Sequence, residues 1–246
     1  MRHIAASGNY NLFTTTNATY DPTLHVEDCT VDAAYNVVYD SHNTQNFKSV
    51  YFGNSIVKMT VANKPFYSTK AKDAHTQQLI RLDNNVFYAE TPLQNYLINC
   101  GDRSQAFLTT RLQVEVTNNT IYNIYQPNIM IRAYVLAGLT VTKNVGYYTG
   151  VTAKNYLTGV YDTAGFTVDK AEVTYNYLYT APVSDTNFWS AKHTGSYTPA
   201  NNQMGDGVEA PFSSMDAAKG YFPVDASVVK TGAGATYDTK AWFKAE

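Results

Sequence analysis

Residues 112–120 read Leu-Gln-Val-Glu-Val-Thr-Asn-Asn-Thr and hold the clearest structural signal in the chain. Leu112, Val114 and Val116 alternate with polar residues, which is the period of a strand with one buried and one wet face. Two asparagines follow directly, and asparagine favours turns because it tolerates left-handed backbone and bonds its own main chain. The stretch predicts a half-buried strand that ends in a tight turn.

Short apolar or alternating runs, broken by Asn, Gly, Asp or Pro, recur along the chain. Gly53 and Asn54 are expected to form a turn or bulge between two such runs. Residues 128–142 are mainly apolar, with Arg132 as the charged residue, which predicts strands covered on both faces. We find no internal repeat of solenoid or propeller type. The pattern predicts an all-β protein, and the fold that we expect is an antiparallel β-sandwich.

One or two short helices and several long loops are expected within a single domain of residues 1–246. Residues 69–82 are the best helix candidate, although residues 79–88 fit a hairpin around Asn84–Asn85 equally well. Residues 182–220 form an irregular, loop-rich region in which residues 213–219 suggest a short helix. The tail, residues 221–246, is expected to add one or two strands around residues 231–234 and ends in Trp242 and Phe243.

The composition is poor in charge and rich in tyrosine. Charged residues make up 15% of the chain and tyrosine contributes 21 residues, against about 25% charge in an average domain. A charge-poor surface lowers the desolvation cost of association, and tyrosine offers an apolar ring with a polar tip. The formal net charge is −2 and the N-terminus has no basic arm, so strong nucleic-acid contact is not expected. No secretory signal and no membrane span are expected either.

The sequence carries no recognisable catalytic or cofactor-binding motif, so we expect neither an enzyme nor a cofactor. The five histidines lack metal-ligand spacing, and no nucleophile elbow or phosphate-binding loop occurs. Asp206 and Glu209 are candidate calcium ligands, the alternative being a plain polar turn. Cys29 and Cys100 can form at most one disulfide, and free buried thiols are expected.

The 112–120 stretch, followed by Ile129-Met-Ile-Arg-Ala-Tyr-Val-Leu-Ala, resembles the capsid proteins of small icosahedral viruses over about thirty residues. The resemblance implies a jelly roll of two four-stranded sheets, with long loops such as residues 182–212 on its outer surface. The chain departs from that pattern in lacking an Arg/Lys-rich N-terminal arm.

These observations suggest a virion structural protein that self-assembles, through tyrosine-rich, charge-poor surfaces, with copies of itself or with other virion proteins. The expected interface residues are Tyr175, Tyr177, Tyr179, Trp189, Trp242 and Phe243. The alternatives are a carbohydrate-binding β-sandwich of adhesin or lectin type and a phage tail or decoration protein. A hydrolase whose scattered carboxylates meet in space is a further alternative.

Overall fold

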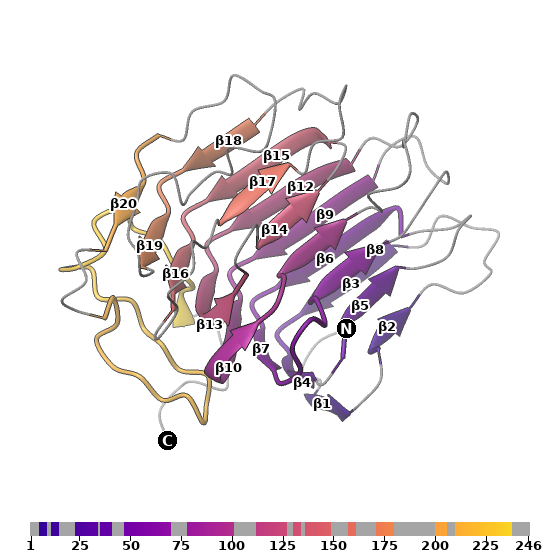
Figure 1. Cartoon of the computed structure of the whole chain (residues 1–246), viewed down its shortest axis with the longest axis horizontal. Helices are drawn as coiled ribbons and strands as arrows, with labels where there is room; N and C mark the ends of the chain where they lie inside the picture. Colours follow the sequence, from indigo (N-terminus) through magenta and orange to yellow (C-terminus); the bar gives the residue numbers. More distant parts are fainter. Residues whose placement is uncertain are drawn as a thin grey trace.

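The computed structural model contains only strands, turns and irregular segments in the residues that it describes. These residues are 5–8, 11–14, 23–33, 35–40, 47–69, 78–100, 112–126, 130–133, 136–148, 157–160, 171–179, 200–205 and 210–237. Their strands form three sheets, here called A, B and C (Figure 1).

Sheet A contains eight strands: β1 (Ala5–Gly8), β4 (Thr30–Ala33), β7 (Ile56–Met59), β10 (Val86–Gln94), β13 (Thr120–Tyr125), β16 (Val145–Tyr147), β19 (Tyr177–Tyr179) and β20 (Gln203–Met204). Sheet B contains six: β2 (Phe13–Thr14), β5 (Val38–Asp40), β8 (Tyr67–Thr69), β11 (Ile98–Cys100), β14 (Ile131–Ala133) and β17 (Thr158–Val160). Sheet C also contains six: β3 (Thr23–Glu27), β6 (Ser49–Gly53), β9 (Gln78–Asp83), β12 (Leu112–Thr117), β15 (Leu136–Thr142) and β18 (Ala171–Thr174).

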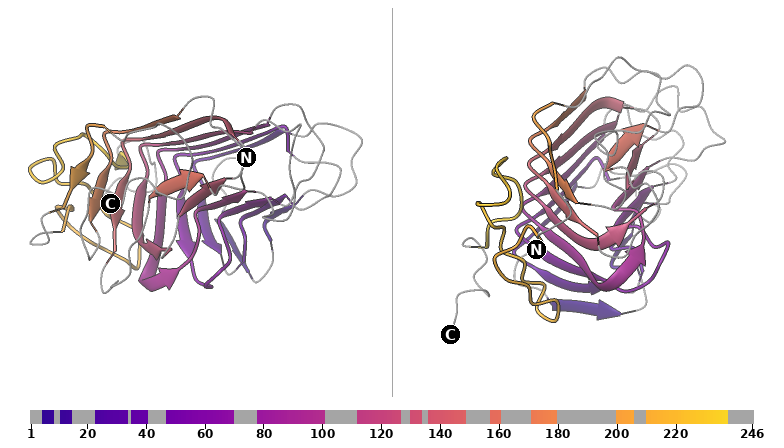
Figure 2. Two further views of the ribbon diagram at one scale, coloured as in Figure 1. Left: turned by 45° about the horizontal axis from the view of Figure 1, so that its top comes forward. Right: turned by 60° about the vertical axis from the view of Figure 1, so that its left-hand side comes forward.

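The chain is a parallel β-solenoid. It visits sheets A, B and C in that order and then returns to sheet A one strand further along, so neighbours within a sheet come from successive turns. Every pairing between these strands is parallel, as in β9 with β12 and β12 with β15. Figure 2 shows the strands of successive turns stacked along the long axis of the molecule.

The expected antiparallel β-sandwich is therefore wrong, and so is the jelly roll implied by the resemblance to viral capsid proteins. Alternation of apolar and polar residues specifies which face of a strand is buried but not the direction of its partner. The Asn118–Asn119 turn is real, but it carries the chain from sheet C to sheet A instead of back along the same sheet. The same holds for Gly53–Asn54 and for Asn84–Asn85, where a hairpin was the alternative.

The expectation of no internal repeat is also wrong. Equivalent positions on sheet A are Thr30, Ile56, Val86, Thr120, Val145 and Tyr177, which lie between 25 and 34 residues apart. The number of residues between equivalent strands therefore differs from one turn to the next. A search for a fixed period in the sequence misses such a repeat, although successive turns of the coil place equivalent strands in the same sheets.

Inward-facing apolar side chains from all three sheets fill the solenoid. In sheet C, Val114 and Val116 are fully buried, which confirms the strand predicted there. The rings of Phe52, Phe66 and Phe87 meet edge to face with centroids 4.9 Å apart, and they come from β6, the residue before β8, and β10. One interdigitated core thus joins the three walls.

The corner between sheets C and A has two residues in each turn, and the second residue points inward to form a ladder. The ladder consists of Cys29, Ser55, Asn85, Asn119, Asn144, Asn176 and Asn202. The backbone N–H of Asn119 donates to Oδ1 of Asn144 at 3.0 Å, and Asn119 Nδ2 donates to the same oxygen at 2.9 Å. Asn119 Nδ2 also donates to the carbonyl of Leu82 in the preceding turn. The asparagine ladder thereby satisfies polar backbone groups that each corner would otherwise bury unpaired.

The first residue of each corner points outward and has left-handed backbone. Its φ angle lies near +55° in Asn84, Asn118, Lys143 and Tyr175, although lysine and tyrosine rarely adopt this conformation. Tyr175 therefore separates β18 from β19. Because Tyr175 lies on a corner, it does not share one face with Tyr177 and Tyr179.

Residues 210–237, here called the C-terminal segment, cover the outer face of sheet A. Phe222 stacks on Tyr122 with centroids 4.2 Å apart and also contacts Tyr88, while Phe212 meets Tyr147 edge to face. The segment lies at the end of the solenoid that holds β19 and β20 (Figure 2, yellow). Gln203 of β20 bonds the backbone of Val228 and Lys230, which ties the segment to the last turn.

The structure corrects the remaining expectations for helices and for the tail. Residues 213–219 form a bend, a bridge and a turn where a helix was expected, and residues 221–237 make only isolated bridges, such as Phe212 with Val224, where strands were expected. The predicted helix at 69–82 is wrong at both ends, because β8 ends at Thr69 and β9 begins at Gln78, and residues 70–77 lie outside the described residues. The apolar stretch 128–142 contains β14 and β15.

Replacing a ladder asparagine should strongly destabilise the protein. Asn144→Ala leaves the buried N–H of Asn119 and the carbonyl of Val116 without the partners that Asn144 supplies. We expect the free energy of unfolding, measured by urea denaturation, to fall by about 3 kcal/mol or more, since each unpaired buried group costs about 1–3 kcal/mol. The neighbouring Lys143→Asn should change it by less than about 1 kcal/mol in the stabilising direction, because asparagine tolerates positive φ. A loss below about 1 kcal/mol for Asn144→Ala would contradict a ladder of structural importance.

Tyr237 fastens the C-terminal segment and should make stability depend on alkaline pH. Its buried hydroxyl accepts from the Phe222 N–H at 2.7 Å and donates to the Gly220 carbonyl at 3.0 Å, and burial raises its pKa well above the ordinary 10.0. The folded state keeps this proton above pH 10 while the unfolded state releases it, so stability falls as pH rises. Tyr237→Phe should flatten that fall by up to about 1.4 kcal/mol per pH unit between pH 10 and about 11.5.

The same variant should lose about 1–3 kcal/mol at neutral pH, because two buried backbone groups lose their partner. The exposed Tyr175→Phe is the control and should leave both the stability and its pH slope unchanged. An unaltered alkaline slope in Tyr237→Phe would show that other tyrosines set the pH dependence.

Candidate functional site

The outer face of sheet C carries two registered rows of mainly polar side chains, one member from each turn. The first row is His25, Tyr51, Arg81, Glu115, Thr140 and Glu172. The second row is Glu27, Gly53, Asp83, Thr117, Thr142 and Thr174. Since parallel strands lie about 4.8 Å apart, neighbouring members of a row are within reach of one ligand.

Tyr51 lies flat along this face. A Cβ atom on Gly53 would stand 2.3 Å from the Tyr51 hydroxyl oxygen and under 3 Å from two carbons of the ring. The ring therefore occupies the space that a side chain at position 53 would fill. Glycine at this position is what allows an aromatic surface to rest on the sheet.

His25 extends the aromatic surface on one side of Tyr51. The two rings have centroids 4.5 Å apart and are tilted by 51°, and the His25 side chain is 63% exposed. His25 Nε2 also lies 3.4 Å from Glu27 Oε2. We call His25, Tyr51 and Gly53, with the carboxylates of Glu27 and Asp83 that flank Gly53 in the register, the aromatic platform.

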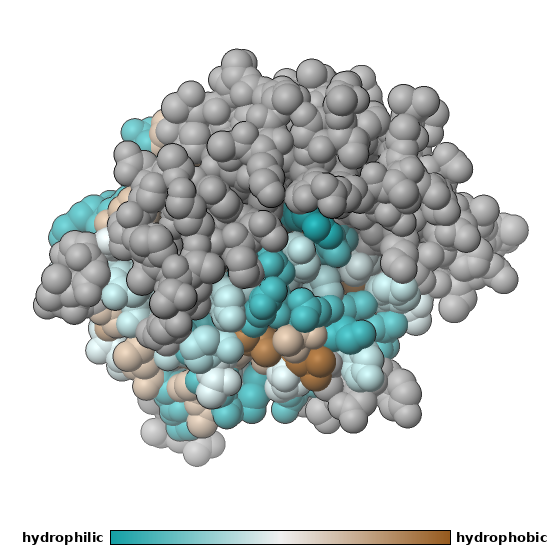
Figure 3. Space-filling view, in the orientation of Figure 1, coloured by the Kyte–Doolittle hydropathy of each residue, from teal (hydrophilic) through white to brown (hydrophobic). Residues whose placement is uncertain are grey.

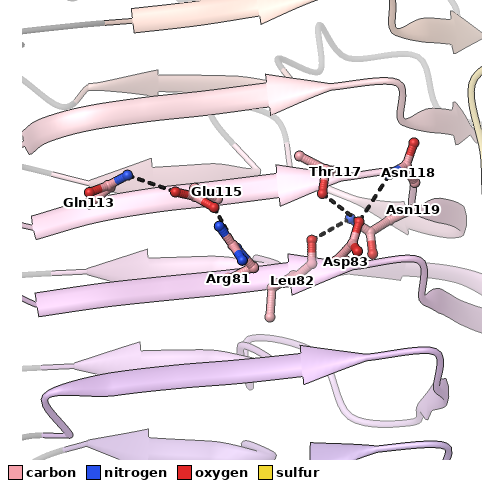
Figure 4. A network of polar contacts seen from close by, with 8 residues as sticks. All are labelled: Arg81, Leu82, Asp83, Gln113, Glu115, Thr117, Asn118 and Asn119. Carbon is pink, nitrogen blue, oxygen red and sulfur yellow. Dashed lines mark hydrogen bonds and ion pairs between the residues drawn. The ribbon is translucent and has the colours of Figure 1, made fainter. Parts of the chain in front are cut away.

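Hydrogen-bonding side chains on β9 and β12 border the aromatic platform (Figure 4). Arg81 Nε donates to Glu115 Oε2, and Gln113 Nε2 donates to Glu115 Oε1 at 2.6 Å. Asp83 Oδ1 accepts from Thr117 Oγ1 at 2.6 Å and from Asn118 Nδ2 at 3.0 Å. These bonds hold the guanidinium and the Asp83 carboxylate in fixed positions before any ligand arrives, which lowers the ordering cost of binding.

The Tyr51 hydroxyl remains protonated at neutral pH. Partial burial raises its pKa, and the nearby carboxylates of Asp83 and Glu27 raise it further. The hydrogen bond and charge of Glu115 likewise raise the pKa of Arg81. The face thus offers a phenol donor, a guanidinium donor and carboxylate acceptors around one flat ring.

The residues predicted from sequence as functional lie elsewhere or outside the described residues. Tyr177 is buried beneath the C-terminal segment, Tyr179 is half-buried against Tyr147, and Tyr175 is 45% exposed on its corner. Trp189, Trp242, Phe243, Asp206 and Glu209 are outside the described residues. Cys29 is a buried free thiol, as predicted, and the side chain of Cys100 is not among those described.

Among the described residues, no group of three or more His, Cys, Asp or Glu side chains is arranged to hold a metal ion. That part of the chain contains no helix with the length and hydrophobicity needed to span a membrane.

Sequence reasoning missed the aromatic platform because residues 25–27, residues 51–53 and Asp83 lie on three successive turns and meet only through the parallel register. One local signal was available. Tyr51 and Gly53 are separated by a single residue on a strand, so they point to the same side, and a glycine next to an aromatic on one face leaves room for the ring.

Comparisons with protein-family models, with curated proteins and with solved structures each found no match to this chain.

Proposed function

We propose that this β-solenoid is a carbohydrate-binding protein whose ligand lies on the outer face of sheet C. The observation that carries the proposal is the Tyr51 ring resting on Gly53 between two carboxylates. A sugar ring has apolar C–H faces and a rim of hydroxyl groups. A flat aromatic ring with hydrogen-bonding groups at its edge complements both features.

The regular face of the solenoid supports an extended ligand more than a compact one. Successive turns repeat polar side chains at strand spacing along one direction, and stacked repeats provide long binding surfaces in other solenoid proteins. Thr117, Thr140 and Thr142 continue the rows beyond Arg81 and Glu115. A polysaccharide chain offers hydroxyl groups along such a path.

A virion subunit that self-assembles remains an untested prediction. The prediction of a virion subunit rested in part on a jelly-roll fold, and the β-solenoid contradicts that fold. Among the described tyrosines, only Tyr35 and Tyr175 are exposed. The surface visible in Figure 3 is mainly hydrophilic where residues are described. Size-exclusion chromatography with light scattering tests this role, since assembly predicts particles or rings at high concentration.

Removing the platform ring should weaken carbohydrate binding. Affinity gel electrophoresis with a panel of soluble plant, fungal and bacterial polysaccharides identifies the ligand, and calorimetry on the best binder gives Kd. We expect Tyr51→Ala to raise Kd roughly three- to tenfold. This change corresponds to the loss of about 0.5–1.5 kcal/mol of binding free energy, the usual contribution of an aromatic contact. Gly53→Ala should weaken binding similarly, because the added methyl displaces the ring from the sheet without removing it.

Tyr175→Ala provides the matched control, since it removes an exposed tyrosine that lies on a corner and not on the outer face of sheet C. It should bind as the unaltered protein does. The proposal is wrong if no polysaccharide is retarded, or if Tyr51→Ala and Gly53→Ala both bind with unchanged Kd while remaining folded by circular dichroism.

A further inference from the structure

The aromatic platform is bracketed by carboxylates. In the register of sheet C, Gly53 is the partner of Glu27 on one side and of Asp83 on the other. The two acidic residues are therefore two strand spacings apart, roughly 10 Å between Cα atoms. That is about the span of one hexopyranose ring with a hydrogen bond at each end, and the Tyr51 ring lies over the middle of it.

Among the described residues, negative charge predominates around this position. Glu27 and Asp83 flank the ring, Asp28 follows β3 at the corner, and Arg81 is the positive charge that acts on Tyr51. Arg81 is already paired with Glu115 on β12, so its charge is offset locally. Lys48 and Lys143 lie at strand ends, before β6 and after β15.

We propose that the platform selects a neutral, hydroxyl-rich polysaccharide and excludes polyuronates, an inference that rests on the proposed carbohydrate-binding function. The carboxylates of Glu27 and Asp83 accept hydrogen bonds from the hydroxyl groups of one sugar unit. The Tyr51 hydroxyl donates to a sugar oxygen. The aromatic ring covers the apolar face of the same unit.

Exclusion of polyuronates follows from charge repulsion. A uronate carboxylate on the bound sugar would lie within a Debye length, about 8 Å at physiological ionic strength, of both flanking carboxylates. Carboxylates cannot hydrogen-bond to one another when all are ionised, since each is only an acceptor. A uronate unit therefore meets repulsion where a neutral sugar gains two hydrogen bonds.

The test compares the binding of neutral and acidic polysaccharides to the unaltered protein and to a variant that lacks the two negative charges. The full chain and the double variant Glu27→Gln/Asp83→Asn are run by affinity electrophoresis against neutral galactomannan, xylan and β-glucan, and against polygalacturonate and alginate. Glutamine and asparagine keep an acceptor oxygen at each position but remove the charge. Tyr51→Ala is run beside them.

We expect the unaltered protein to bind a neutral polysaccharide and to bind polyuronates at least tenfold more weakly. The double variant should gain polyuronate affinity roughly five- to tenfold, through loss of two nearby like charges. Its affinity for the neutral polysaccharide should fall by roughly three- to tenfold, since hydrogen bonds to amide oxygens are weaker than hydrogen bonds to carboxylates, so the two ligand classes shift in opposite directions. Raising the salt concentration should strengthen polyuronate binding to the unaltered protein but not to the double variant.

Each outcome separates the two proposals. Polyuronate binding by the unaltered protein that is as tight as neutral binding, and sensitive to Tyr51→Ala, overturns the selectivity and keeps the carbohydrate-binding function. No binding of any polysaccharide overturns both proposals. Thermal unfolding of each variant confirms that the chain is folded.

Discussion

The hydrogen bonds of the asparagine ladder are the constraint on which the rest of the solenoid depends. Each inward amide accepts from the corner of the preceding turn and donates back to it, as Asn144 does with Asn119 and Val116. A coil of parallel strands must bury its corners, and a buried corner without partners for its N–H and C=O groups is costly. Because the ladder fixes the corner between sheets C and A in every turn, strands on both sides of it are aligned without slippage.

That alignment places side chains in rows on the outer faces of sheets A and C, and the two faces differ in what covers them. On sheet A, the rows of Tyr88, Tyr122 and Tyr147 form an aromatic strip, which the C-terminal segment covers with Phe212 and Phe222. On sheet C, the outward rows are polar, and the described C-terminal segment packs elsewhere. Burial of the first face supplies much of the apolar contact outside the core, while the second face keeps ordered polar groups in water. The proposed binding role follows from this asymmetry.

The sequence allowed prediction of strands and turns but not of their partners. Alternation around Val114 and Val116 correctly predicted a half-buried strand, and Asn118–Asn119 correctly predicted a turn. The direction of pairing depends on contacts between residues 25 or more positions apart, as for Thr120 and Val145, which local alternation does not encode. A stronger clue was present in the recurring pairs Asn84–Asn85, Asn118–Asn119 and Asn201–Asn202, the first two of which follow strands of mixed apolar and polar residues. The aromatic platform could not be predicted before the register was known.

The aromatic platform lies in the turns where the inward residue of the corner is not asparagine. From Asn85 onward the ladder is built of asparagines, but the two earlier turns place Ser55 and Cys29 there, and Ser55 Oγ bonds the Gly53 carbonyl at 2.6 Å. Small residues thus occupy both the inner corner and the outer strand position in the turn that holds Tyr51. A glycine on a strand costs conformational entropy and buries no side chain, so its presence needs a compensating gain. Accommodating a flat aromatic ring between two carboxylates is such a gain, and departures from local rules are expected at functional sites.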